Sequence, residues 1–409
     1  MLPTGGVQVR LDLLLAREPF VEVFSATLAG FLRQRFGWQG HIAWGRKPSN
    51  STGLLVNAKL NLIFPARCAT ASLRALGAEY AYHPHFVRRV LQRAYVHHAV
   101  SRPLRRLFSS AWVDISPWPE AVSHWCILPG NHSIRIVDMV QDECIVLRKT
   151  GFNPALLDNV VRMRQSFPDL PGPRLLEANL EQGWYREQRI AGLPLNRLAD
   201  PAMVQRSFDA ARQALVGLYQ RTLLTEPVSE WLDDRLQRIT AAVAALPAIY
   251  GAEIRERILG LTQGLANRLR QQSTSASRMA LPTGFTHGDF QPANILVPAL
   301  PEDGPVYLID WEYGGRRCVW YDALVFELRS RFPIGLSGRI AAWKQDTQQQ
   351  QASLAWCGEV ASGWNAASCI STFLLEDLLL RLIDTTIPGL LRQETGFLSF
   401  IEELSRLEG

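Results

Sequence analysis

The sequence lacks the features that mark several large classes of protein. Its 43 Lys and Arg residues against 38 Asp and Glu residues leave a net charge of only +5, too small an excess for a dedicated nucleic-acid-binding domain. None of the six cysteines stands in a C-x-x-C pair, so neither a zinc site nor a disulfide framework is indicated. No apolar run of about 18 residues occurs, and no basic secretion signal opens the chain. We therefore expect a cytoplasmic protein with no nucleic-acid partner and no integral membrane contact.

Several common catalytic and nucleotide-binding motifs are missing as well. There is no G-x-G-x-x-G and no G-x-S-x-G, and the segment from Gly40 to Lys47 fails the P-loop pattern because Arg and Lys stand where Lys and Ser/Thr are required. What the sequence does have is an apolar content of 47% over 409 residues. This content excludes a disordered chain, and the length favours two or three folded units.

Residues 1–122 contain no motif that we recognise. Apolar spacing over residues 18–36 predicts a helix, and residues 54–65 predict one or two strands. Residues 85–108 predict a basic helix, broken or kinked at Pro103. Six arginines lie in it: Arg88, Arg89, Arg93, Arg102, Arg105 and Arg106. Two interpretations of this Arg88–Arg106 stretch stay open, namely a patch for an anionic partner and a solvated helix face.

From residue 125 the pattern becomes that of a strand–loop–strand–turn–strand unit, ending near residue 148. A helix over residues 154–167 and a strand over residues 184–190 are predicted next. The rest of the chain is mostly helical, over residues 201–223, 228–245, 252–272, 321–331, 336–350 and 371–383. One short β-rich island, between Gly284 and Gly314, interrupts these helices.

The island contains the residues that point to chemistry. It reads FTHGDFQPANILV, and a second apolar strand that ends in Asp310 follows it. Asp289 and Asn294 stand five residues apart in a loop where Pro292 forbids a regular helix. A hairpin through residues 301–305 would bring Asn294 and Asp310 to one end of a sheet. An amide oxygen and a carboxylate there suit Mg²⁺, and Asp289 stands nearby to accept a proton.

The strings HGDFQPANIL and LIDWEYGG resemble the aminoglycoside phosphotransferase/choline kinase family, whose fold is protein-kinase-like. The resemblance covers roughly residues 125–385. It implies that Asp289 is the catalytic base, that Asn294 and Asp310 bind magnesium, and that His287 supports the catalytic loop. ATP and Mg²⁺ are then the expected cofactors.

The resemblance also assigns residues upstream of the island. The loop at Gly130, Asn131 and Ser133 takes the place of the family's glycine loop, whose backbone N–H groups face phosphates. The phosphate-contacting base would be Arg148, with Lys149 as the alternative on the opposite face of the strand.

Further family positions agree less closely. The acid that usually pairs with the phosphate-contacting base has only Asp158 as a counterpart, and the backbone near Glu187 would meet adenine. Asp322 matches the acid that braces the catalytic loop, while Glu312 is either a partner of the metal or substrate or a surface acid. Three acids of the C-terminal helices, Glu376, Asp377 and Asp384, are read either as contacts for a cationic or polyhydroxyl acceptor or as a solvated face.

The expected fold is therefore α+β and bilobal, protein-kinase-like, with an added N-terminal α/β extension. We assign residues 1–122 to the extension, 123–191 to a small β-rich lobe and 192–409 to a helical lobe. The expected function is transfer of the terminal phosphate of ATP to a hydroxyl of a small aminoglycoside-, amino-alcohol- or sugar-like acceptor. Two alternatives remain: a kinase of a sugar or glycoconjugate intermediate selected by the extension, and a non-catalytic nucleotide-binding regulatory module.

Overall fold

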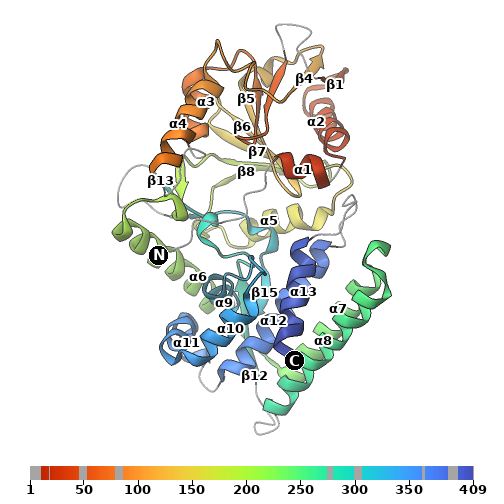
Figure 1. Ribbon diagram of the computed structural model, residues 1–409, viewed down its shortest axis with the longest axis vertical. Helices are drawn as coiled ribbons and strands as arrows, with labels where there is room; N and C mark the ends of the chain where they lie inside the picture. The colour runs from red at the N-terminus through yellow and green to blue at the C-terminus, as the bar shows by residue number, and fades with distance from the viewer. Residues whose placement is uncertain are drawn as a thin grey trace. The chain divides into compact units, whose positions relative to one another are not determined.

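The computed structural model describes residues 11–17, 19–45, 53–78, 86–273, 280–298, 306–361, 364–385 and 395–408 (Figure 1). The chain divides into two compact units. The first comprises Met1–Ser166, Gly172–Val204 and Leu296–Tyr307, and the second comprises Phe167–Pro171, Gln205–Ile295 and Leu308–Gly409.

A nine-stranded sheet is the framework of the first unit, in the order β1-β4-β2-β3-β5-β6-β7-β9-β8. Neighbouring strands pair antiparallel. The strands are β1 (His41–Gly45), β2 (Leu54–Asn57), β3 (Leu62–Pro65), β4 (Ala111–Ser116), β5 (Trp125–Pro129), β6 (Ser133–Asp138), β7 (Glu143–Arg148), β8 (Leu175–Asn179) and β9 (Trp184–Gln188). The helices of this unit are α1 (Leu11–Arg17), α2 (Phe20–Phe36), α3 (Thr70–Ala78), α4 (Phe86–Val100) and α5 (Pro154–Ser166).

The first 122 residues and the strands that follow them share this sheet. β3 pairs with β5 through Ile63 and Ile127. One apolar core runs from α2, through Phe24 and Leu28, to Ile145 and Leu147 of β7. The predicted segments 1–122 and 123–191 therefore lie within a single unit in the structure.

The strands β5, β6, β7, β9 and β8, with α5 between β7 and β8, form the part that the sequence assigns to a small β-rich lobe. A tight loop joins the first two strands, a basic pair stands at the end of β7, and a helix then leads to the last two strands. Next along the chain, β10 (Gly192–Pro194) pairs antiparallel with β13 (Ile295–Pro298), and β14 (Tyr307–Leu308) lies on the other side of β13.

The second unit is mainly helical. Its helices are α6 (Pro201–Thr222), which begins in the last residues of the first unit, α7 (Val228–Ala244), α8 (Gly251–Ser273), α9 (Tyr321–Leu328), α10 (Leu336–Gln345), α11 (Thr347–Leu354), α12 (Ala366–Thr385) and α13 (Thr395–Glu408). A small sheet, β11 (Leu224–Pro227), β12 (Ala280–Thr286) and β15 (Gly315–Cys318), lies among them in the order β11-β12-β15. α12 is buried without a break from Ser368 to Leu380, and it packs on α7 and α8.

The α+β class predicted from the sequence is confirmed, with a β-rich first unit and a helical second unit. Several element boundaries differ from the prediction, and two helices differ most. The helix expected over residues 336–350 is broken at Asp346, whose side chain accepts the Gln349 N–H and begins α11. The basic helix expected over residues 85–108 ends at Val100. The turn predicted over residues 301–305 lies outside the described residues.

None of the described helices is long and apolar enough to cross a membrane.

Candidate active site

The catalytic loop follows β12 in the second unit, and Asp322 at the start of α9 holds its backbone. The two carboxylate oxygens of Asp322 accept the N–H groups of His287 and Gly288 at 2.7 and 2.9 Å. The hydroxyl group of Tyr219 donates to the same carboxylate at 2.7 Å. All of these groups are buried, so strong charge-assisted hydrogen bonds from Asp322 fix the backbone of the loop. This is the bracing position that the resemblance assigns to Asp322.

His287 links the predicted catalytic loop to the segment between β14 and Asp310. Its Nδ1 accepts the N–H of Asp289 at 3.2 Å, so the ring proton sits on Nε2 and is donated to the carbonyl of Ile309 at 2.9 Å. Burial lowers the pKa of His287, although Asp322 and Asp289 oppose the shift. The neutral imidazole therefore acts as a fixed spacer between two functional segments.

Gly288 is required by the path of the backbone. Its φ is +83°, a left-handed conformation that side chains disfavour, and a Cβ there would lie 2.1 Å from the carbonyl oxygen of Tyr313. The G of the H-G-D string thus allows the loop to pass against the segment that follows Asp310.

Asp289 is held by three side chains. Arg331 Nε donates to Oδ1 at 2.7 Å, while Gln291 Nε2 and Asn294 Nδ2 donate to Oδ2 at 2.9 and 2.8 Å. Asn294 Nδ2 also donates to the Asp289 carbonyl at 2.8 Å. The spacing of five residues between Asp289 and Asn294 therefore places the two side chains in direct contact.

Arg331 joins Asp289 to a buried ion-pair network on α12. Its Nη1 donates to Oδ1 of Asp377 at 2.7 Å, and Arg381 donates to the other oxygen of Asp377 at 2.9 Å. Burial would raise the pKa of Asp377, but the two guanidinium groups hold it below its usual value. Burial likewise works to lower the pKa of Arg331, yet its neighbours Tyr321 and Asp377 hold it well above the usual value. Both groups are therefore charged in the folded protein.

The predicted metal ligands come together at one place. The N–H of Ile309 donates to the carbonyl of Asn294 at 3.0 Å, which sets Asp310 beside Asn294. Because Asn294 Nδ2 is bonded to Asp289, the amide oxygen is the atom left to face a cation. Among the described residues no group of three or more His, Cys, Asp or Glu side chains forms a metal cluster. Mg²⁺ does not require one, since it is commonly bound through one or two protein oxygens, with water and phosphate completing the shell. The donor set fits magnesium.

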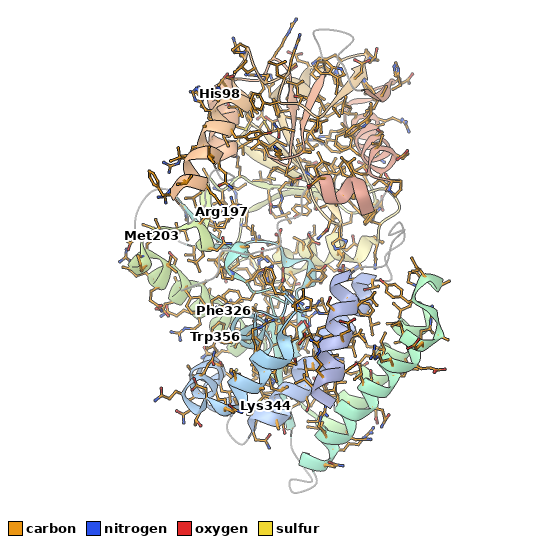
Figure 2. The ribbon with its side chains drawn as sticks, viewed as in Figure 1. His98, Arg197, Met203, Phe326, Lys344 and Trp356 are labelled. Atoms are coloured by element: carbon orange, nitrogen blue, oxygen red, sulfur yellow. The ribbon has the colours of Figure 1, made fainter. Side chains whose placement is uncertain are left out.

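Aromatic packing anchors the loop beside Asp289. Phe290 is buried and packs against Phe326 and Trp356, with ring centroids 5.7 Å away in both cases. Phe208 of α6 completes the cluster, and Phe326 and Trp356 are labelled in Figure 2. The F of the H-G-D-F string therefore has a packing role that supports the position of Asp289.

In the first unit, the loop between β5 and β6 is tied to the end of β7. The N–H of Gly130 donates to the carbonyl of Ser133 at 3.0 Å, which closes the turn. Lys149 Nζ donates to the carbonyl of Asn131 at 2.9 Å. Arg148 lies opposite Ser133 in the β6–β7 register. The five predicted phosphate-contacting positions are thus neighbours.

Arg148 and Lys149 have different surroundings. Lys149 is 0% exposed, and its ammonium group lies 5.3 Å from the ring centroid of Phe20 and 5.2 Å from that of Phe152. Arg148 is only partly buried and lines a cavity of about 280 Å³ with Gly183 at its wall. This difference favours Arg148 as the residue that meets phosphates, with Lys149 as a support for the loop.

The remaining predicted positions of this unit are buried or partly buried. Glu187 lies inside β9 opposite Cys144, and Arg164 of α5 is close to it. Burial lowers the pKa of Arg164, and the charge of Glu187 opposes that shift. Asp158 on α5 has a buried Oδ1 for which the described residues provide no hydrogen-bond donor. No ion pair between Asp158 and Arg148 is observed among the described residues.

Arg331 is the residue of this site that the sequence did not reveal. It lies 42 residues after Asp289, outside both motif strings. α9 ends at Leu328, and Arg329 with φ 47° turns the chain back, which directs Arg331 toward the loop. No local pattern signals such a turn, so only the folded structure shows the contact.

Comparison with known proteins identifies the type of domain. The family described as "Phosphotransferase enzyme family" matches residues 155–356. The chain therefore contains a phosphotransferase family domain. The predicted catalytic loop, Asn294, Asp310 and Arg331 all fall within the matched residues. No curated protein sequence matches the chain.

The chain is similar to several solved structures of small-molecule kinases. A choline kinase from Streptococcus pneumoniae is 13% identical, with a TM-score of 0.43, over 71% of this chain and 90% of that one. An aminoglycoside phosphotransferase from Streptomyces rimosus is 19% identical, with a TM-score of 0.38, over 64% and 92%. A Plasmodium vivax ethanolamine kinase is 10% identical, with a TM-score of 0.45, over 83% and 94%. At these values the likenesses say nothing of this chain's acceptor.

Proposed function

We propose that this phosphotransferase transfers the terminal phosphoryl group of ATP to a hydroxyl group of a small molecule. The observation that supports this most directly is the arrangement of Asp289 against Asn294, with Asp310 connected to Asn294 through the Ile309 N–H. A carboxylate positioned to take a proton, beside an amide oxygen and a second carboxylate suited to Mg²⁺, is the combination that phosphoryl transfer to an alcohol needs.

The chain's own residues would act on the acceptor hydroxyl. An ionised carboxylate offers about four lone-pair sites. In Asp289, three of these sites accept side-chain donors. One site is left to accept the hydroxyl proton. The hydroxyl oxygen then forms a bond to the terminal phosphorus, the bond from that phosphorus to the bridging oxygen breaks, and ADP leaves. Mg²⁺ bound by Asn294 and Asp310 would neutralise phosphate charge.

The nucleotide-contacting residues of the proposal lie in the first unit. Arg148 and the backbone of the Gly130–Ser133 loop would meet phosphates, and the backbone near Glu187 would meet adenine. The support for this is the mutual hydrogen bonding of the loop and the end of β7. The non-catalytic alternative is less favoured, because a module that only binds nucleotide has no need of a carboxylate in the position of Asp289.

An acceptor screen tests the proposal. The full chain is incubated with Mg²⁺ and ATP labelled in the terminal phosphate, against aminoglycosides, amino alcohols, sugars and nucleosides. We expect a labelled phosphate ester and an equal amount of ADP with at least one class, and no product after chelation of the metal. Nucleotide binding without transfer to any acceptor, under conditions where a known small-molecule kinase is active, would support the regulatory module instead.

A further inference from the structure

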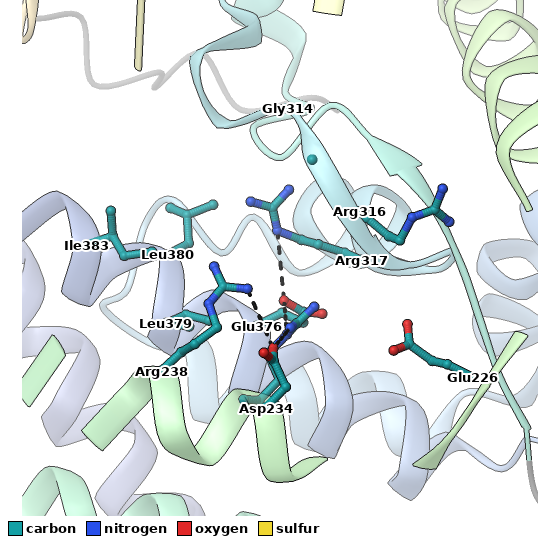
Figure 3. A pocket seen from close by; sticks show the side chains of 12 residues that line it. Glu226, Asp234, Arg238, Gly314, Arg316, Arg317, Glu376, Leu379, Leu380 and Ile383 are labelled. Atoms are coloured by element: carbon teal, nitrogen blue, oxygen red, sulfur yellow. Dashed lines mark hydrogen bonds and ion pairs between the residues drawn. The ribbon is translucent and has the colours of Figure 1, made fainter. Parts of the chain in front are cut away.

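A cavity of about 490 Å³ lies in the second unit between α7, β15 and α12 (Figure 3). Its walls include Gly314 and the neighbouring residues that follow Asp310 along the chain. Tyr313, immediately before Gly314, passes against Gly288 of the catalytic loop. Arg317 Nη1 donates to the carbonyl of Tyr313 at 2.8 Å and to Thr286 Oγ1 at 3.0 Å. One wall of the cavity is therefore hydrogen-bonded to β12 and to the segment that passes against Gly288.

More arginines than acidic residues line this cavity. Four guanidinium groups line it, from Arg235, Arg238, Arg316 and Arg317, against three carboxylates, from Glu226, Asp234 and Glu376. Arg235 is the buried member, and its Nε lies 3.2 Å from Glu376, whose other oxygen accepts the Trp231 N–H at 3.3 Å. Glu376, only 3% exposed, is thus compensated inside the protein.

The acids of α12 are poorly placed to attract a cation from solvent. Asp377 is fully buried and bound by two arginines, and Asp384 accepts the Tyr313 hydroxyl at 2.9 Å. These groups and Glu376 were the sequence's candidates for a cationic or polyhydroxyl acceptor. Their internal pairing disfavours recognition of a cation by this wall.

Two arginines of the cavity keep donors available. The nearest carboxylate to Arg238 is Asp234, at 3.6 Å, which is longer than a hydrogen bond. Arg317 Nε is 4.0 Å from Glu376, and within the described residues its Nη2 makes no hydrogen bond. Figure 3 shows Arg238 on α7 and Arg317 on β15 reaching the cavity from two walls. Guanidinium groups in this arrangement match an oxyanion.

We propose that this cavity binds an oxyanion group of the acceptor, a phosphate ester or a carboxylate, through Arg238 and Arg317. The acceptor is then an anionic alcohol. This inference rests on the proposed function, and it selects among the acceptor classes which that proposal leaves open. In the reaction, the acceptor hydroxyl loses its proton to Asp289 and gains the phosphoryl group, while the oxyanion remains bound and unchanged.

A binding experiment tests the cavity without requiring turnover. The full chain, with its nucleotide site saturated with ADP and Mg²⁺, is titrated calorimetrically with inorganic phosphate, acetate and choline. Arg238→Gln is compared with Arg270→Gln. The Arg270 side chain on α8 is 46% exposed and 3.9 Å from Asp233, while that of Arg238 is 49% exposed and 3.6 Å from Asp234. Arg270 does not line the cavity, so it is a matched control.

We expect phosphate or acetate to bind the wild-type chain, and Arg238→Gln to weaken that binding about 10-fold or more, the scale of one charge-assisted contact. Arg270→Gln should bind as the wild type does, and Arg238→Lys should recover part of the loss. The preferred anion distinguishes a phosphate ester from a carboxylate. Binding of choline but of neither anion, or equal weakening by both Gln variants, would overturn the inference.

Turnover separates this inference from the proposed function. Glycerol, glycerate and glycerol 3-phosphate share hydroxyl groups but differ in charge. We expect the anionic members to have the higher kcat/KM, and Arg238→Gln to raise KM for them with little change in kcat. Efficient phosphorylation of uncharged or cationic alcohols alone would keep the kinase function and refute the oxyanion site. Oxyanion binding without phosphorylation of any alcohol would refute the kinase function and the acceptor role of the cavity together.

Discussion

Arg331 donates to Asp289 at 2.7 Å and, through another nitrogen, to Asp377 at 2.7 Å. One guanidinium group therefore bridges the proposed base and a buried carboxylate of α12. The guanidinium also donates to the carbonyl of Gly288, so it fixes both the backbone and the side chain of the loop. Arg331 is a positioning residue in this account, because it acts on the reaction through the orientation of Asp289.

The contact between Arg331 and Asp289 predicts that one substitution lowers both stability and catalysis, while a matched substitution lowers stability alone. Arg331→Gln and Arg381→Gln each remove one of the two ion pairs of Asp377, so both should lower the free energy of unfolding by roughly 3 kcal/mol or more. Only Arg331→Gln also releases Asp289. We expect it to reduce kcat at least about 10-fold beyond Arg381→Gln, with KM for ATP little changed. Denaturant unfolding and steady-state kinetics on both variants check this, and equal kcat values would remove the positioning role.

The backbone at Gly288 predicts a severe effect from one methyl group. Gly288→Ala places a Cβ 2.1 Å from the Tyr313 carbonyl at a φ of +83°, so we expect a loss of about 2 kcal/mol or more and loss of activity. Gly260→Ala is the matched control, because a Cβ there meets nothing within 4 Å and Gly260 lies inside α8. It should be neutral or stabilising by up to about 1 kcal/mol. Thermal unfolding measures both, and a harmless Gly288→Ala would contradict the geometry.

His287 predicts a pH dependence of stability. Burial lowers its pKa from the usual 6.5, so below that pH the unfolded chain binds a proton that the folded chain resists. The stability that neutral His287 contributes is therefore fully present above pH 6.5. It is lost as the pH falls toward the pKa of His287 in the folded chain, by up to about 1.4 kcal/mol per pH unit. His287→Gln should remove this slope, whereas His97→Gln, on the exposed side of α4, should retain it. Urea unfolding from pH 7.5 to 5 provides the measurement; an unchanged slope in His287→Gln would exclude this residue as its source.

Deletion of residues 1–120 tests how far the first unit depends on its N-terminal part. If the remaining residues fold without this part, the truncated protein should still bind nucleotide but use its acceptor poorly. The shared core favours the alternative, since the deletion would expose Ile127, Ile145 and Leu147 and leave β5 as an unpaired edge. We expect an insoluble or unfolded product, by soluble yield and circular dichroism. A folded, nucleotide-binding truncation would contradict this expectation.

The Arg88–Arg106 stretch shows why the role of this N-terminal part could not be derived from the sequence. Arg105 is buried, and its guanidinium donates to the carbonyl of Cys68 at 2.8 Å and to Thr70 Oγ1 at 2.9 Å. Arg88 and Arg93 on α4 are exposed. A run of arginines reads the same in either environment, so charge alone could not separate the structural residue from those available to an anionic partner.

The catalytic loop was predictable because its chemistry depends on neighbours in the chain. Asp289 and Asn294 are in contact as their spacing implies, and strand alternation placed Arg148 and Lys149 on different faces. The sequence pattern did not show which of these faces α2 covers, because α2 lies more than a hundred residues before Lys149. The burial of Lys149 by Phe20 depends on the same long-range packing. The same limit hid Arg331, because a tertiary turn brings it to the loop.

The central claim is that Asp289 accepts the proton of the acceptor hydroxyl. The most direct test is single-turnover phosphoryl transfer by Asp289→Asn, with ATP binding measured on the same preparation and Asp209→Asn, a partly exposed acid of α6, as the control. Asp289→Asn should bind ATP nearly as the wild type does. Its rate of phosphate transfer should be lower by about 10²-fold or more, the scale of a lost general base. A transfer rate close to that of the wild type would contradict the account.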